Sequence, residues 1–250
     1  MALPGISCYC STYGRPLHIL ENSIACFLEQ DYPGPKELVI LNDFSDQELV
    51  FKHPQVRIIN LKDRIKPLGK KFNLNIDYCQ YDILATWEDD DVFLKNRLRT
   101  SYHRMQNGVF HTHDAFYEKE KYDLLKIQNV FHSTHMFDRK MFHKVGGYNS
   151  VNDVCSIDIE FMEAMQREIG PYTQDLSIEE IFYIYVWPEG QSYHGSGWGA
   201  ERQNISDSAA ETVAFQVKNQ LVKLGRITLV PKLRYNFYQY LPKELDIKKS

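Results

Sequence analysis

The sequence predicts an α/β protein: a Rossmann-like three-layer αβα fold around a mainly parallel central sheet, followed by a helical extension. Short apolar runs alternate with helix-like segments through residues 6–91, an order that favours parallel strands joined by right-handed crossovers. Several of these runs end in polar turns. The chain has 250 residues, of which 43% are hydrophobic and 13% aromatic. This is enough material for one such domain with an appendage.

In the first half, the expected strands are short, mainly apolar runs, as in strands that are buried on both faces. They are residues 6–11, 37–41, 56–61 and 83–87. A turn with Gly and Pro at residues 12–16 follows the first strand. Residues 17–30 carry one apolar stripe at helical spacing and predict a helix. Residues 70–81 are the second expected helix, just before the strand at 83–87.

The second half is less regular. Helical spacing predicts helices over residues 94–105, 158–169 and 209–224, with a further short helix before the turn at 146–149. Expected strands are residues 109–111, 123–130, 132–137 and 182–187. Residues 188–204 form an expected Gly-rich polar loop. The tail from Arg226 onward is basic and aromatic, and it either binds an anionic acceptor surface or packs on the domain.

The most informative stretch is residues 82–93, DILATWEDDDVF, where an apolar run ends in four consecutive carboxylates. These are Glu88, Asp89, Asp90 and Asp91. Four acids at a strand end repel one another, and open α/β sheets bind ligands at the carboxyl ends of their strands. A hard divalent cation is the partner that carboxylate oxygens suit. The alternative is a solvated acidic turn, and the acids alone favour neither interpretation.

Composition argues against several other classes. The mean hydropathy is −0.44, and the roughly 18 consecutive apolar residues that a membrane span needs are absent. The start, MALPGISCYC, lacks the basic and long apolar regions of a secretory signal, so we expect a soluble cytoplasmic protein. Five cysteines without a CxxC pair indicate free thiols and not a zinc site. A net charge of −4 gives no general reason to expect a polyanion partner.

Four segments together resemble the family 2 nucleotide-sugar glycosyltransferases, which have the GT-A fold. In chain order they are CSTYGRP, ELVILNDFSD, GKKFNLNIDYCQYDILATWEDDD and KMFHKVGGYNSVNDVCSIDIEFMEAM. They are similar to the family's first-strand turn, its second-strand Asp turn, its helix leading to the acidic DXD motif, and its late Gly-Gly…Glu-Asp segment. Asn42 and Phe44 depart from the second-strand turn, and Ile157 replaces the late Glu. The resemblance extends over about residues 6–200.

The resemblance implies a hexosyl- or pentosyltransferase that moves a sugar from a UDP- or GDP-sugar to an acceptor hydroxyl with inversion. It also implies a Mn²⁺ or Mg²⁺ ion that bridges the donor phosphates and stabilises the charge of the leaving group. Alignment to the DXD motif makes Glu88 and Asp90 the expected metal ligands, with His194 from the loop either completing the site or contacting the diphosphate. Because four acids stand in a row, Asp89 and Asp91 are the alternative pair.

On the same resemblance, five residues are expected to contact the nucleotide: Thr12, Arg15, Asp43, Asn73 and Asp89. Asp43 is expected to accept an N–H from a uracil-type base, from a turn outside the core. Asp89, when it is not on the metal, is expected to hold ribose hydroxyls. The structural alternatives are an ordinary turn-forming Asp43 and an Arg15 that lies on the surface before the proline.

Asp158 is the expected general base, because the resemblance places it where a carboxylate faces the reacting carbon of the sugar. From there it takes the proton of the acceptor hydroxyl during in-line attack. The structural alternative is that Asp158 caps its helix, since Asp is a favoured N-cap residue. Glu160 is the second candidate for the base. Trp198 either stacks on an acceptor sugar or base or packs against its own loop.

The resemblance divides the chain into a GT-A domain over residues 1–204 and a helical extension over 205–250 packed on the same domain. Within the domain, residues 1–105 are the expected nucleotide-sugar-binding half and 106–204 the acceptor-side half. The expected acceptor is a glycan, a small molecule or a modified nucleic-acid base. A nucleotidyltransferase has a similar acidic site, but it needs a Gly-rich basic loop, and CSTYGRP has one glycine. A non-catalytic nucleotide-sugar-binding module is the third class.

Overall fold

A computed structural model describes residues 2–152, 156–186 and 205–242 of the chain. Its centre is a six-stranded sheet with strand order β4-β2-β1-β5-β10-β7. Four neighbouring strands run parallel: β4 (Val56–Asn60), β2 (Lys36–Asn42), β1 (Ile6–Thr12) and β5 (Ile83–Thr86). β10 (Met136–Asp138) pairs in antiparallel fashion with β5, and the edge strand β7 (Val109–Phe110) pairs in antiparallel fashion with β10. The predicted α/β class with a mainly parallel sheet is confirmed.

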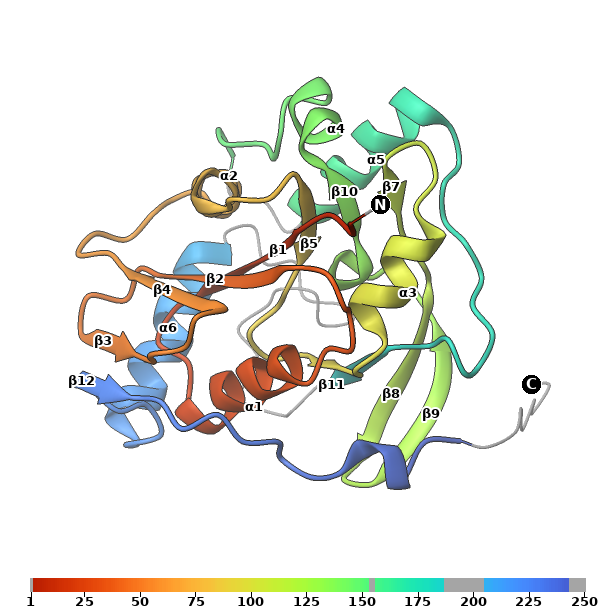
Figure 1. Cartoon of the computed structure of the whole chain (residues 1–250). Coiled ribbons are helices and arrows are strands. Elements are labelled where there is room, and N and C mark those ends of the chain that lie inside the picture. Colours follow the sequence, from red (N-terminus) through yellow and green to blue (C-terminus); the bar gives the residue numbers. More distant parts are fainter. Residues whose placement is uncertain (1, 153–155, 187–204, 243–250) are drawn as a thin grey trace.

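Alternate residues of β1 point into two different cores, because successive side chains of a strand face opposite sides of the sheet. Ile6, Cys8 and Cys10 pack in one core, which includes α1 (Leu17–Leu28). Tyr9 packs in the other, with α2 (Leu68–Tyr78), α4 (Arg139–Lys144) and α5 (Ile157–Ile169). Figure 1 shows α1 on one side of the sheet and α2 and α4 on the other. The three-layer arrangement follows from this alternation.

A smaller sheet lies beside the first, with strand order β6-β11-β8-β9. Its strands are β6 (Val92–Phe93), β11 (Tyr183–Val186), β8 (Asp114–Glu120) and β9 (Asp123–Gln128). β6 directly follows the acidic residues, so their turn connects the two sheets. The helix α3 (Arg97–Arg104) comes next in the chain. Strand β8 was not predicted, because its sequence, DAFYEKE, is rich in charge.

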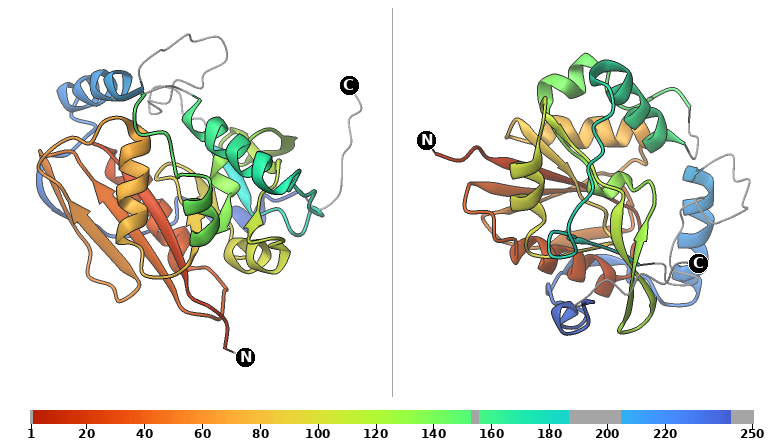
Figure 2. Two further views of the ribbon diagram at one scale, coloured as in Figure 1. Left: turned by 90° about the horizontal axis from the view of Figure 1, so that it is seen from above. Right: turned by 90° about the vertical axis from the view of Figure 1, so that its right-hand side faces the viewer.

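The C-terminal part packs on the carboxyl ends of β1 and β2. Ala209 and Val213 of α6 (Ile205–Lys218) form a small core with Phe44. Gly14 has a φ of +55°, and a Cβ there would lie 2.4 Å from a methyl of Val213, so this contact requires glycine. The side view in Figure 2 (right) shows α6 at this edge, with α2 above the sheet and α1 below.

The chain after α6 returns along the domain. β12 (Gly225–Thr228) pairs in parallel with β3 (Gln47–Val50). Further on, Arg234 and Tyr235 both contact the carboxylate of Glu118, and a short 3-10 helix, η2 (Phe237–Gln239), ends the described tail. Figure 1 shows this segment running past α1 to β8 and β9. The described part of the basic aromatic tail, residues 226–242, therefore packs on the domain.

Two predicted elements differ from the observed ones. The strand expected over residues 132–137 is a 3-10 helix, η1 (His132–Thr134), followed by β10. The hydroxyl of Thr86 lies within hydrogen-bond distance of the carbonyls of His132 and His135, which have this side-chain partner in the turn. The helix expected over 209–224 begins earlier and ends at Lys218, near Gln220 with its φ of +58°. Within the described residues, no helix has the length and apolar composition needed to cross a membrane.

Candidate active site

The acidic residues lie where three parallel strands end together. Tyr9 of β1 pairs with Thr86 of β5, and Thr12 pairs with Asn42 of β2. The residues that follow these strands are therefore neighbours at the carboxyl edge of the sheet. This edge is where open α/β sheets bind their ligands.

The four carboxylates differ in their access to solvent. Asp89 and Asp91 are buried, whereas Glu88 and Asp90 are partly exposed. Buried and partly exposed residues thus alternate along the acidic turn. The two more exposed carboxylates are separated by one residue.

Asp89 is held by Arg15, which follows β1. The guanidinium donates to both carboxylate oxygens of Asp89, at 2.9 and 2.6 Å, and lies 3.0 Å from Asp90. Arg15 is only 2% exposed. The alternative of a surface Arg15 is therefore wrong. The pair instead fastens the acidic turn to the first strand with bidentate, charge-assisted hydrogen bonds.

Asp91 is also fully engaged. Its carboxylate accepts hydrogen bonds from Ser133 at 2.7 Å and from Tyr183 at 2.8 Å. Burial, and then the neighbouring Asp90, raise the pKa of Asp91 well above its usual range. These contacts tie the acidic turn to η1 and to β11.

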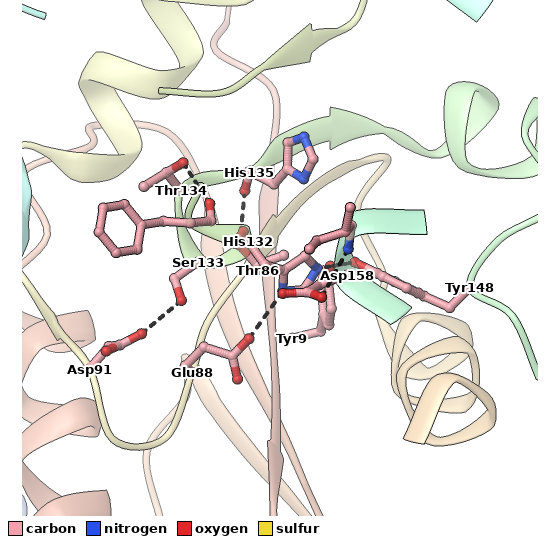
Figure 3. A network of polar contacts seen from close by, with 12 residues as sticks. Tyr9, Thr86, Glu88, Asp91, His132, Ser133, Thr134, His135, Tyr148 and Asp158 are labelled. Carbon is pink, nitrogen blue, oxygen red and sulfur yellow. Dashed lines mark hydrogen bonds and ion pairs between the residues drawn. The ribbon is translucent and has the colours of Figure 1, made fainter. Parts of the chain in front are cut away.

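Glu88 contacts a network that the sequence did not reveal. His132 Nδ1 lies 3.2 Å from the Glu88 carboxylate, and Nε2 lies 2.5 Å from the hydroxyl of Tyr148. That hydroxyl is in turn 2.6 Å from the hydroxyl of Tyr9. Burial is the main reason that the pKa values of Tyr9 and Tyr148 are raised well above their usual range. Figure 3 shows the chain of contacts from Glu88 to the two tyrosines.

Asp158 stands beside this network. It lies in the first turn of α5, a helix that contacts η1, and its charge is one of those that raise the pKa of Tyr148, after burial, Tyr9 and Glu88. The N-cap position of α5 is Ser156, so the alternative in which Asp158 is the N-cap is wrong. In Figure 3, Asp158 is drawn next to His132 and Tyr148.

Glu160, the second candidate for the base, already accepts hydrogen bonds from neighbouring side chains. Its carboxylate accepts hydrogen bonds from Asn149 at 3.0 Å and from Ser156 at 3.1 Å. The carboxylate of Asp158, by comparison, accepts one from the adjacent backbone N–H of Ile159 at 2.9 Å. Glu160 therefore ties the start of α5 to the turn at 146–149.

The sequence led us to expect Asp43 on a turn outside the core. In the structure its side chain is buried. Its side chain is 0% exposed and accepts hydrogen bonds from the ammonium group of Lys71 at 2.6 Å and the backbone N–H of Ile65 at 2.8 Å. Lys71 also donates to the carbonyl of Thr12 at 2.7 Å. The expectation failed because sequence alone did not place the buried cation of α2 against this turn.

Asn73 and Thr12 are both near this edge, in different settings. The amide of Asn73 donates to the carbonyl of Tyr148 and accepts from its backbone N–H, each at 2.9 Å. It thereby fixes the turn that carries Tyr148. The hydroxyl of Thr12 is buried and has no hydrogen-bond partner among the described residues.

The arrangement suits a cation that is shared with a ligand. Glu88 and Asp90 offer oxygen donors, which fit Mg²⁺ and Mn²⁺. In the described parts of the chain, no three His, Cys, Asp or Glu side chains gather as a preformed metal site. A diphosphate and water would therefore have to supply the remaining ligands. His194 and Trp198 lie outside the described residues.

Comparison with known proteins agrees with this geometry. Residues 7–169 match the sequence model of Glycosyl transferase family 2, which is more than half of the chain. Among curated protein sequences, none matches.

Solved structures resemble the chain in fold. TarS of S. aureus has a TM-score of 0.53 and 14% identity, over 88% of this chain and 40% of TarS. The chain thus spans less than half of that protein. TarS 1-349 in complex with UDP-GlcNAc has a TM-score of 0.55 and 14% identity, over 85% of this chain and 72% of the other.

A third structure is the mannosyltransferase PcManGT from Pyrobaculum calidifontis, in complex with GDP-Man and Mn²⁺. It has a TM-score of 0.54 and 12% identity, over 87% of this chain and 78% of the other. Identities this low show likeness of fold alone. The sequence match and the fold together establish that this chain belongs to glycosyl transferase family 2 and has the GT-A fold.

Proposed function

We propose that this protein transfers a sugar from a nucleotide-diphosphate donor to an acceptor hydroxyl, with inversion, and that the reaction depends on Mn²⁺ or Mg²⁺. The observation that carries the proposal is the pair of accessible carboxylates, Glu88 and Asp90, at the carboxyl edge of the sheet. Asp158 lies next to the same network from α5. The fold neighbours solved with UDP-GlcNAc and with GDP-Man and Mn²⁺ support a UDP- or GDP-sugar as donor.

Glu88 and Asp90 would hold the cation together with the donor phosphates. When bound, the cation stabilises negative charge on the leaving diphosphate. The alternative pair, Asp89 and Asp91, is buried, and its carboxylates contact Arg15, Ser133 and Tyr183. Glu88 and Asp90 also have protein contacts, with His132 and Arg15, but they are the more exposed pair. This difference in exposure favours Glu88 and Asp90 as the ligands.

The role of Asp158 is that of general base. As the acceptor oxygen forms its bond to the anomeric carbon, its proton passes to the Asp158 carboxylate. The bond between that carbon and the diphosphate oxygen breaks, and its electron pair leaves with the nucleotide. Attack opposite the leaving group inverts the configuration at carbon. A positioned base contributes roughly 10²–10⁴-fold to such a rate.

The contacts of Arg15 and Asp43 change what is proposed for them. Arg15 orients the acidic turn through Asp89. Asp43 and Lys71 form a buried pair beneath the ends of β1 and β2. We propose that the Arg15–Asp89 pair and the Asp43–Lys71 pair form the floor of the nucleotide-binding site, at the ends of β1 and β2. Thr12 and Asn73 support it from the strand end and from the Tyr148 turn.

The test is calorimetric titration of UDP and GDP with and without Mn²⁺. We expect binding of at least one nucleotide to depend on Mn²⁺, and Asp90→Ala to weaken it by more than the about 10–100-fold typical of outer-shell changes. Asp82→Ala is the matched control, because this acid lies just before β5 and its side chain is 88% exposed. Equal affinity with and without Mn²⁺ would contradict the metal site. A transfer assay then separates the enzyme from a binding module.

A further inference from the structure

His132 occupies a position with two specific contacts. Nδ1 faces the Glu88 carboxylate at 3.2 Å and Nε2 faces the Tyr148 hydroxyl at 2.5 Å. The residue is 7% exposed and belongs to η1, 44 residues from Glu88 in sequence. One imidazole thus joins the acidic turn after β5 to the turn that precedes α5.

The hydrogen bonds of this network have one consistent direction. A carboxylate only accepts, and a neutral imidazole has one donor and one acceptor nitrogen. His132 Nδ1–H therefore donates to Glu88, and in the neutral ring Nε2 accepts from the O–H of Tyr148. In that case the oxygen of Tyr148 accepts from the O–H of Tyr9. The Glu88 carboxylate requires the proton on Nδ1, and the Tyr148 contact is compatible with the same tautomer.

The imidazole is also fixed in space. The carbonyl of His132 accepts from the Thr86 hydroxyl at 2.9 Å. Its ring stacks on Phe72 of α2, with centroids 5.6 Å apart and planes at 29°. The backbone of His132 is thus held by β5 and its ring by α2, two elements of the main domain. Such support is what a group needs if it is to hold a second side chain in one orientation.

We propose that His132 is a positioning residue that orients the Glu88 carboxylate toward the cation of the donor complex. The inference rests on the proposed metal-dependent function. The hydrogen bond holds Glu88 through one oxygen, Oε1, and the second oxygen can then serve the cation. Removing a partner of this kind typically costs about 10–100-fold in metal affinity.

Two substitutions separate the two nitrogens of the ring. The amide of Asn reaches about as far as Nδ1, so His132→Asn keeps a donor for Glu88 and loses the Tyr148 contact. The longer amide of Gln reaches about as far as Nε2, so His132→Gln keeps a partner for Tyr148 and loses the Glu88 contact. The measurement is the Mn²⁺ concentration that half-saturates UDP or GDP binding, together with the melting temperature of each variant.

We expect His132→Gln to raise the half-saturating Mn²⁺ concentration by about 10–100-fold, and His132→Asn to stay within about threefold of wild type. Metal-free nucleotide binding should be equal in both. Equal Mn²⁺ requirements in the two variants would overturn the role of His132, while metal-dependent binding by the wild-type protein would still stand. If the wild-type protein binds UDP and GDP equally well with and without Mn²⁺, both the proposed function and this inference are overturned.

A third variant keeps the test decisive if His132→Asn fails to fold. Tyr148→Phe retains the ring and removes the O–H that contacts Nε2. Nε2 then loses its contact with the Tyr148 oxygen, while the Glu88 carboxylate still requires a proton on Nδ1. We expect the half-saturating Mn²⁺ concentration to rise by less than in His132→Gln, because the ring keeps its hydrogen bond to Glu88 and is held less firmly. A rise as large as that in His132→Gln would overturn the assignment of the effect to the Glu88 contact.

Discussion

At the scale of single residues, two buried ion pairs support the edge of the sheet where the candidate site lies. Arg15 binds Asp89, and Lys71 binds Asp43. Burial lowers the pKa of Lys71, and the neighbouring Asp43 opposes that shift. Removing one partner of a buried pair leaves an uncompensated charge, which is costlier than the pair's net contribution. We therefore expect substitutions of these residues to change both the stability of the fold and the geometry of the candidate site.

Asp43→Ala should lower the free energy of unfolding by about 3–5 kcal/mol, because it leaves the Lys71 ammonium group buried without its carboxylate. The backbone N–H of Ile65 also loses its acceptor. Urea denaturation gives the measurement. Asp46→Ala is the matched control, because this acid is exposed in the same turn. Equal free energies of unfolding for the two variants would contradict a buried, structural Asp43 and support the exposed turn position expected from the sequence.

Asp158→Asn should reduce the transfer rate by roughly 10²–10⁴-fold and leave the melting temperature unchanged. The amide keeps an oxygen for the backbone N–H of Ile159 but cannot take a proton near neutral pH. Glu160→Ala should do the reverse, because its contacts with Asn149 and Ser156 are structural. Transfer rates and melting curves of both variants decide between them. A fully active Asp158→Asn would remove Asp158 from the chemistry.

At the scale of elements, η1 connects most of the site. Its residues contact Glu88, Asp91 and Tyr148. The sequence predicted the carboxyl edge of the sheet, because apolar runs ending in acids are a local pattern. It did not predict the contacts of η1, because Glu88 and His132 are 44 residues apart and meet only after folding. Residues 132–137 were expected to form a strand, whereas the carbonyls of His132 and His135 contact the Thr86 hydroxyl in a turn.

Two further histidines hold η1 and its flanks against the segment after α5. His111 contacts the Thr173 hydroxyl at 2.9 Å and the Phe131 carbonyl at 3.1 Å. His135 contacts the Tyr172 hydroxyl at 2.6 Å. Both histidines are 0% exposed. Such groups make the stability of this region depend on pH.

We expect the protein to lose stability as the pH falls below about 6.5. Burial, and then His113, lower the pKa of His111 to about 3, and burial, followed by His111, lowers that of His135 well below its usual value. Between these values and about 6.5 the unfolded chain binds more protons, so stability is present above that range and lost within it. Two such groups should cost about 3 kcal/mol between pH 7.5 and 5.5.

Urea denaturation at the two pH values measures this loss. Replacing both buried histidines, in His111→Gln with His135→Gln, should remove most of the difference between pH 7.5 and 5.5. His103→Gln is the control, because His103 is exposed on α3. A wild-type protein that is equally stable at both pH values would contradict the assignment of these two histidines as buried and neutral.

At the scale of the whole molecule, the site is assembled from both sheets and from the helices on one face. The acidic turn leads from β5 into β6, and Tyr183 of the second sheet holds Asp91. Asp158 and Tyr148 come from the chain at and before α5. A ligand at this edge would therefore contact elements from different parts of the chain. Its binding free energy would add to the stability of the fold.

The last prediction is that Mn²⁺ and nucleotide stabilise the protein together and not separately. Within the described residues no preformed cluster of three ligands holds a cation, so Mn²⁺ alone should bind weakly until a diphosphate supplies further oxygens. At about 100 times the dissociation constant, a ligand adds roughly 2.7 kcal/mol, or about 5–10 °C for a chain of this size. Thermal melts with Mn²⁺, with UDP or GDP, and with both give the measurement. Asp90→Asn should abolish the combined shift and Asp82→Asn should keep it, whereas an equal shift with Mn²⁺ alone would indicate a complete metal site in the free protein.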